Sequence, residues 1–208
     1  MIDQTTLITY VAIVLGFVFI PGPATLLTVA RASSAGTRVG VATGMGIAVG
    51  DMIHTVLAVV GLSAIILASA FLFSLIKYLG AAYLIYLGLR AIFEKTVRAG
   101  PSPTISISPS AAFRQGILSE VLNPKTALFF LAFLPQFVQP ENGAVLLQLT
   151  ILGSIMVALG FFSTLIFALA AGRIGGFLRR NATIVRWQGK VVGSIYCALG
   201  VRLALQER

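Results

Sequence analysis

Residues 20–25 read Ile20-Pro21-Gly22-Pro23-Ala24-Thr25, and they interrupt an apolar run that carries no charged side chain from residue 4 to residue 30. Two prolines and a glycine break a helix, because proline has no N–H to donate and its ring clashes with the preceding turn. Inside a bilayer, irregular backbone persists only where protein covers it or a wet cavity meets it. The break therefore predicts either a ligand site in mid-membrane or a packing kink, since proline is fairly common in spanning helices.

The composition indicates an integral membrane protein. Of the 208 residues, 58% are hydrophobic and 10% are charged. Uncharged runs such as 126–140 and 142–172 suit spanning helices of about 20 residues. The formal charge of +9 does not indicate a nucleic-acid partner, because the basic residues gather in short loops where they serve as topology signals and contact anionic headgroups. The single cysteine excludes an internal disulfide and a cysteine metal cluster.

The pattern of apolar runs predicts an all-α, polytopic membrane protein with six spans in one domain over residues 1–208. The expected spans are 5–32, broken at 21–23; 39–66; 71–93; 111–138, interrupted at Asn123-Pro124; 144–171; and 187–205. Residues 94–110, rich in proline and serine, are expected to form a linker between a first repeat at about 5–93 and a second at about 111–205. Only 191–201 is free of charge in the last span, so the side of the C-terminus stays open.

The chain repeats itself weakly. Gly22-Pro23-Ala24-Thr25 recurs as Asn123-Pro124-Lys125-Thr126, and Gly80-Ala81-Ala82-Tyr83 recurs as Gly193-Ser194-Ile195-Tyr196. Three helices per half make an odd number, so the two halves must point in opposite directions. Inverted halves with a broken helix at matching positions are typical of secondary transporters whose site lies near the bilayer midplane.

The distribution of lysine and arginine predicts the orientation. The connections after the first, third and fifth spans hold nearly all of these residues, and those after the second and fourth hold none. By the positive-inside rule these connections, including linker 94–110, are cytoplasmic and the N-terminus faces outside. Arg202 and Arg208 would then lie at the outer end, which the positive-inside rule does not favour.

Two ionisable residues lie deep in the predicted spans. Asp51 falls near the middle of the second span, where a carboxylate must face the bundle interior and be neutral or paired. It is a candidate proton or substrate-amine site with His54 on roughly the same face, or else a buried acid bonded for packing. Lys125 needs a partner, and the candidates are Asp51, Glu120 and a substrate carboxylate. A structural ion pair between the second and fourth spans is the alternative for Lys125.

Glu120 lies one turn before Pro124 and is either a second protonatable group or an interfacial residue near the cytoplasmic mouth, which we favour. Freed backbone groups at the two breaks can bind a carboxylate through N–H groups and an ammonium through carbonyls. Thr25 and Thr126 add hydroxyl groups nearby. The candidate substrate-binding and coupling residues are Pro21, Gly22, Pro23, Thr25, Asp51, His54, Glu120, Asn123, Pro124, Lys125 and Thr126.

Four motifs together resemble the LysE/RhtB family of bacterial amino-acid exporters over nearly the whole chain. They are Pro21-Gly22-Pro23, the glycine-rich segment ending in Gly50-Asp51, Leu79-Gly80-Ala81-Ala82-Tyr83-Leu84, and Asn123-Pro124-Lys125-Thr126-Ala127-Leu128-Phe129-Phe130. The resemblance implies a protein of the bacterial inner membrane that exports amino acids or close derivatives, of homoserine, threonine, leucine or lysine type. It also suggests coupling to protons.

We therefore expect a secondary transporter, with a small amino acid as substrate, the proton as coupling ion, the lipid bilayer as surroundings, and no cofactor or metal. A homodimer stays open. The first alternative is a small-cation carrier or channel using Asp51, although hard divalent ions want more oxygen ligands than the deep acids supply. An intramembrane enzyme is disfavoured because the only histidine, His54, has no catalytic partner pattern, and a structural subunit would leave the repeated breaks unexplained.

Overall fold

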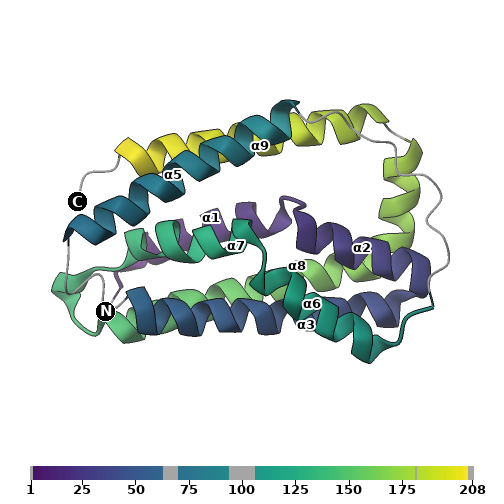
Figure 1. Ribbon diagram of the computed structural model, residues 1–208, viewed down its shortest axis with the longest axis horizontal. Helices are drawn as coiled ribbons and strands as arrows, with labels where there is room; N and C mark the ends of the chain where they lie inside the picture. The colour runs from purple at the N-terminus through teal and green to yellow at the C-terminus, as the bar shows by residue number, and fades with distance from the viewer. Residues whose placement is uncertain (1, 63–69, 94–105, 181, 206–208) are drawn as a thin grey trace.

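The computed structural model describes residues 2–62, 70–93, 106–180 and 182–205, and every regular element within them is helical (Figure 1). The first half holds α1 (Gln4–Phe19), α2 (Pro23–Ala35), α3 (Thr37–Leu57), a π-helical turn η1 (Ala58–Leu62) and α5 (Ala70–Phe93). The second half holds α6 (Pro109–Val121), α7 (Pro124–Leu128), η2 (Phe129–Phe133), η3 (Leu134–Phe137), η4 (Pro140–Asn142), α8 (Val145–Arg180) and α9 (Ala182–Leu205). The predicted all-α class is confirmed.

Both predicted breaks are present. The first separates α1 from α2, which meet at 49°, and the second separates α6 from α7–η3, which meet at 45°. Ile20 and Gly22 are extended at the first break, and Pro23 opens α2, where its missing N–H costs no helical bond. At the second break the Asn123 side chain accepts a hydrogen bond from the backbone N–H of Lys125 at 3.1 Å, which caps α7.

The described residues hold two helices that are long and apolar enough to cross a bilayer, Thr37–Gly61 and Val145–Ala171, and each bent pair adds one more span. The fold is thus that of a polytopic membrane protein with broken first and fourth spans. Helices α5 and α9 have 24 residues each, which is long enough to cross a bilayer, and α9 ends in the apolar stretch Tyr196–Leu205. Of the predicted linker, 94–105 lies outside the described residues, as does the join at 63–69.

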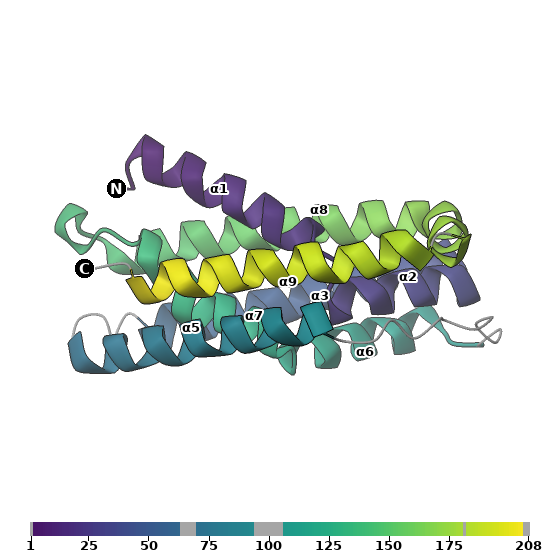
Figure 2. The ribbon, with the colours of Figure 1, turned by 90° about the horizontal axis from the view of Figure 1, so that it is seen from above.

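The two halves run in opposite directions. In Figure 1 α1 and α2 lead from the end that holds the N-terminus to the far end, and α6 and α7 lead back. Helices α3 and α8 are antiparallel, as are α5 and α9, which lie side by side in both views (Figures 1 and 2). The fold is therefore an inverted repeat of the predicted kind.

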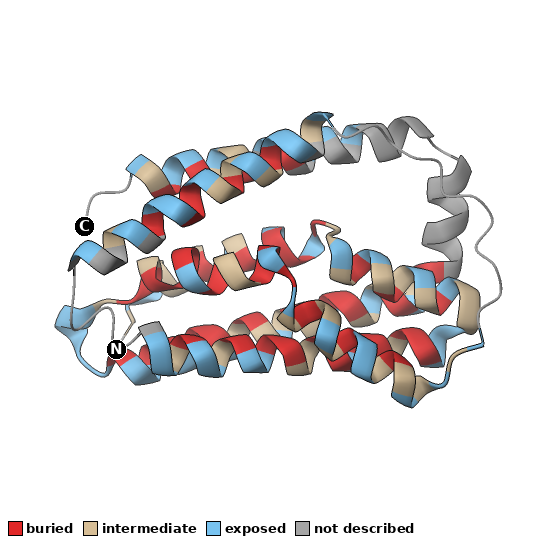
Figure 3. Cartoon of the chain, viewed as in Figure 1, coloured by how far each residue is buried: buried red, intermediate tan, exposed pale blue. Residues whose placement is uncertain are grey.

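Glycines allow the closest helix crossing, between α3 and α6. A Cβ atom on Gly50 would lie 2.5 Å from the Cβ of Glu120, which no native packing tolerates. A Cβ atom on Gly46 would likewise lie 2.0 Å from the backbone oxygen of Phe113, so both glycines keep α3 and α6 in close contact. In Figure 3 much of α5 and α9 is exposed, and large apolar side chains there, such as Leu79 and Phe93, suit contact with lipid.

Candidate functional site

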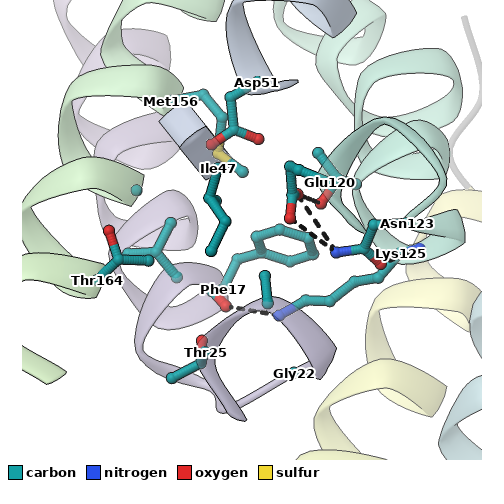
Figure 4. A pocket seen from close by; sticks show the side chains of 14 residues that line it. Phe17, Gly22, Thr25, Ile47, Asp51, Glu120, Asn123, Lys125, Met156 and Thr164 are labelled. Atoms are coloured by element: carbon teal, nitrogen blue, oxygen red, sulfur yellow. Dashed lines mark hydrogen bonds between the residues drawn. The ribbon is translucent and has the colours of Figure 1, made fainter. Parts of the chain in front are cut away.

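The two helix breaks meet at one buried cavity of about 40 Å³ (Figure 4). Its polar lining comes from both halves of the chain: Thr25, Asp51, Glu120, Asn123, Lys125, Thr126 and Thr164. Apolar side chains from α1, α3 and α8 complete it, among them Phe17, Ile47 and Met156. The sequence predicted that the breaks would share a chamber, and the structure places them together.

Glu120 is held in the cavity wall by two neighbours from the second break. Asn123 Nδ2 donates to both carboxylate oxygens, at 3.3 and 3.2 Å, and the Thr126 hydroxyl donates to Oε1. Only 2% of Glu120 is exposed. The expectation of an interfacial residue was wrong, because the tight glycine crossing draws α6 against α3 and buries this turn.

Asp51 projects into the cavity from α3 and is 3% exposed. Its carboxyl group lies within hydrogen-bonding reach of the Glu120 carboxyl group, and Figure 4 shows both at the same side of the cavity. Among the described residues, Asp51 Oδ1 has no hydrogen-bond partner. A Cβ atom on Gly160 of α8 would lie 3.2 Å from the other oxygen, so this glycine leaves the carboxyl group open to an occupant.

Lys125 binds backbone carbonyls of the first break instead of the carboxylates expected from the sequence. Its Nζ donates to the carbonyl oxygens of Phe17 and Ile20, both at 3.1 Å, and lies 4.2 Å from the centre of the Phe17 ring. In an unbroken helix the Phe17 carbonyl would accept from the N–H of residue 21, which is a proline. Lys125 therefore takes the place of the missing backbone donor.

His54 binds the backbone at the second break. Its Nε2 lies 3.0 Å from the carbonyl oxygen of Glu120 and must donate, since a carbonyl only accepts. That carbonyl also accepts from the backbone N–H of Asn123 at 3.0 Å, so His54 adds a second donor to it. His54 is 8% exposed, is stacked on Phe130 and does not line the cavity. It lies next to the site and fixes the backbone there.

The remaining predicted residues divide between the cavity and the breaks. Gly22, Thr25 and Thr126 line the cavity, whereas Pro21, Pro23 and Pro124 shape the breaks without lining it. A Cβ atom on Gly22 would lie 3.2 Å from Lys125 Cδ, so glycine gives the lysine room to pass.

Helix α8 contributes cavity residues that were not among those predicted from the sequence. Gly160 and Thr164 line the cavity four residues apart, and a Cβ atom on Gly44 of α3 would lie 3.0 Å from the Thr164 hydroxyl oxygen. The spacing of Gly160 and Thr164 is a small-xxx-small pattern, which is a sequence signal for a close approach of helices. Tyr196 of α9 was also missed, although its ring centre lies 5.7 Å from Lys125 Nζ.

The arrangement suits a ligand that carries both charges. An open carboxyl group on one side can bind an ammonium, and a lysine bonded only to neutral carbonyls on the other can turn to a carboxylate. The volume of about 40 Å³ is well below the roughly 150 Å³ of a cavity that holds benzene, so an amino acid requires the cavity to widen.

Two inverted halves, a broken span in each and a buried polar cavity where the breaks meet define the class: a multi-pass membrane transport protein. The family model for LysE type translocators matches residues 15–207, and the chain belongs to this family.

Its relatives include the uncharacterized membrane protein YrhP of Bacillus subtilis (strain 168), which is 34% identical with 96% of this chain and 99% of the relative covered. An uncharacterized membrane protein of Pseudomonas aeruginosa is 32% identical, with 94% and 93% covered. The leucine efflux protein of Salmonella typhimurium is 25% identical, also with 94% and 93% covered. No solved structure matches the chain.

Proposed function

We propose that this protein exports amino acids or close derivatives, of leucine, threonine or homoserine type, from the cytoplasm in exchange for protons. The observation that carries the proposal is the buried cavity where an open carboxyl group and a lysine from opposite halves face one space. Membership in the LysE type translocator family and a relative named leucine efflux protein support it.

In this proposal Asp51 binds the ammonium of the amino acid and Lys125 binds its carboxylate. The carbonyls of Phe17 and Ile20 take two of the three hydrogens of Lys125 Nζ, and a substrate carboxylate, which is a stronger acceptor than a neutral carbonyl, draws Nζ away from them. Substrate binding thus loosens the bond between the second break and the first. The coupling of binding to movement at the breaks follows from this exchange of partners.

Alternating access then requires the helices to move as two groups. Helix α1 is bonded to the second repeat at both of its ends, through Lys125 at the break and through Asp3 at its start, where Asp3 N donates to Gln139 Oε1 at 3.1 Å. Helix α2, beyond the break, packs on α3 and α8. We infer that the first break acts as a hinge, because α1 and α2 on its two sides have different partners.

The proposed location is the bacterial inner membrane with the N-terminus outside. The ends of α2, α5 and α8, which lead into the arginine- and lysine-rich connections, all point to one end of the molecule (right in Figure 1). By the positive-inside rule that end faces the cytoplasm.

An export assay tests the proposal. Cells that lack their own exporters are fed amino acids or dipeptides, and intracellular accumulation is compared with and without the protein. Asp51→Asn and Lys125→Met should each lower export about tenfold or more, since a hydrogen bond to a charged group is worth about 1.5–3 kcal/mol. Matched changes at exposed positions, Glu141→Gln and Lys190→Met, should leave export intact.

Two results would overturn the proposal. Full export by both correctly inserted cavity variants would remove the assigned roles. A flux of small cations that no amino acid competes with would favour the cation carrier or channel instead.

A further inference from the structure

Two carboxyl groups face each other inside the cavity, one from each half of the chain. Asp51 and Glu120 are 3% and 2% exposed and lie within hydrogen-bonding reach. The bonds from Lys125 Nζ go to the carbonyls of Phe17 and Ile20 and to neither acid. Two buried carboxyl groups so close together cannot both ionise, because the repulsion between like charges is strong away from water. The pair therefore holds one proton.

The two members of the pair differ in their surroundings. Glu120 accepts three hydrogen bonds, two from Asn123 Nδ2 and one from the Thr126 hydroxyl, which stabilise a carboxylate in a fixed orientation. Asp51 Oδ1 accepts none among the described residues. The proton is therefore bound to Asp51, and the protonated carboxyl group donates a hydrogen bond to the Glu120 carboxylate.

Two other ionisable side chains lie near the pair, and each is bonded elsewhere. Apart from the pair itself, the ionisable side chains that face it are Lys125 from α7 and His54 from the same helix as Asp51. Lys125 is bonded to α1, and His54 is bonded to the backbone of Glu120. The cavity lining contributed by α1, α2 and α8 carries no ionisable side chain.

Building on the proposed function, we propose that the coupling proton and the ammonium of the exported amino acid occupy this carboxyl pair by turns. The ammonium approaches Asp51 past Gly160, and the proton leaves the pair for the aqueous phase. Each occupant brings one positive charge to two carboxylates, so the pair keeps one net negative charge in both states. Exchange at a single place links one proton entering to one amino acid leaving, without a separate proton site.

Infrared spectroscopy of the purified protein tests the shared proton without any substrate. The wild-type protein at neutral pH should show the carbonyl stretching band of a protonated carboxylic acid. Asp51→Asn should abolish this band, because it removes the group that carries the proton, whereas Glu141→Gln at an exposed position should keep it. Absence of the band in the wild-type protein, or its persistence in Asp51→Asn, overturns the proposal.

A second measurement tests the exchange. L-Leucine, L-threonine and L-homoserine are added separately to weakly buffered protein, and proton release is followed with an indicator dye. The compound that the export assay identifies should release one proton per molecule bound and remove the infrared band, whereas its analogue without the amino group should do neither. Gly160→Ala should keep the band but weaken proton release severalfold, since the new methyl group would lie 3.2 Å from Asp51 Oδ2.

The outcomes separate this proposal from the function on which it rests. Binding with no proton released, in a protein that exports amino acids, overturns the shared site and leaves export standing. The band and its loss in Asp51→Asn, in a protein that exports no amino acid, overturn the proposed function and leave the proton on Asp51 standing.

Discussion

At the scale of single residues, a side chain from each half bonds a backbone carbonyl at the break of the other half. The Phe17 carbonyl, four residues before Pro21, accepts from Lys125, and the Glu120 carbonyl accepts from His54 in addition to the backbone N–H of Asn123. The sequence indicated that Lys125 and His54 lie deep, and it located the prolines. It could not indicate which carbonyl each would bind, because that depends on the register between helices far apart in the chain.

The bond between Lys125 and Phe17 makes a stability prediction. Lys125→Met leaves buried carbonyls without a donor and should destabilise the protein by about 1–3 kcal/mol. Pro21→Ala restores the N–H that the Phe17 carbonyl lacks, so the double variant should recover about 1 kcal/mol relative to the sum of the single changes. Thermal unfolding in detergent measures this coupling. Pro140→Ala, at a turn away from the cavity, should show none with Lys125→Met, and an additive result for Pro21→Ala would contradict the account.

At the scale of the elements, the helices and their breaks were largely readable from the sequence. The expected first span, 5–32 with a break at 21–23, is realised as Gln4–Phe19 and Pro23–Ala35. The expected 187–205 begins five residues earlier, at Ala182, because the helix continues through Arg186, a charged residue that is more typical of a loop in a membrane protein. The burial of Glu120 was missed since it depends on how closely α6 approaches α3, which glycines allow but do not by themselves determine.

The glycine crossing predicts a contrast between two substitutions. Gly50→Ala places a methyl group 2.5 Å from Glu120 Cβ, so α6 must shift, at a cost of about 1–3 kcal/mol and with reduced export. Gly16→Ala in α1 meets no atom within 4 Å and should be neutral or stabilise the helix by up to about 1 kcal/mol. Unfolding midpoints and export rates of the two variants check this, and equal behaviour would show that the crossing is not tight.

The start of α1 predicts a pH dependence. Hydrogen bonds from the backbone and hydroxyl of Thr6 and from Gln139 lower the pKa of Asp3 from 3.8 to about 2. Because the folded pKa lies below the unfolded one, the stabilisation is fully present above about pH 4 and is lost as the pH falls through about 2. Asp3→Asn should therefore lower the unfolding midpoint at neutral pH and converge with wild type at the acid end. Parallel curves over the whole range would contradict this.

At the scale of the whole molecule, the internal repeat predicted the architecture better than any single motif did. An odd number of helices per half requires opposite directions, and α3 with α8 and α5 with α9 are antiparallel as expected (Figure 1). What the sequence could not supply is the size of the cavity, because about 40 Å³ results from side chains of several helices packing together. A small cavity with polar side chains from both inverted halves is the form expected of a transporter site.

The orientation of this architecture makes the last prediction, because export from the cytoplasm requires the basic end to face inside. In a Cys197→Ala background, which removes the only cysteine of the chain, Glu141→Cys places a thiol at the end that holds the N-terminus, and Arg38→Cys places one at the basic end. A membrane-impermeant maleimide should label the first in intact cells and the second only after permeabilisation. Both replaced residues are exposed, so accessibility reports the side of the membrane rather than burial. The reverse pattern would place the N-terminus inside, and the basic connections would then face outward against the positive-inside rule.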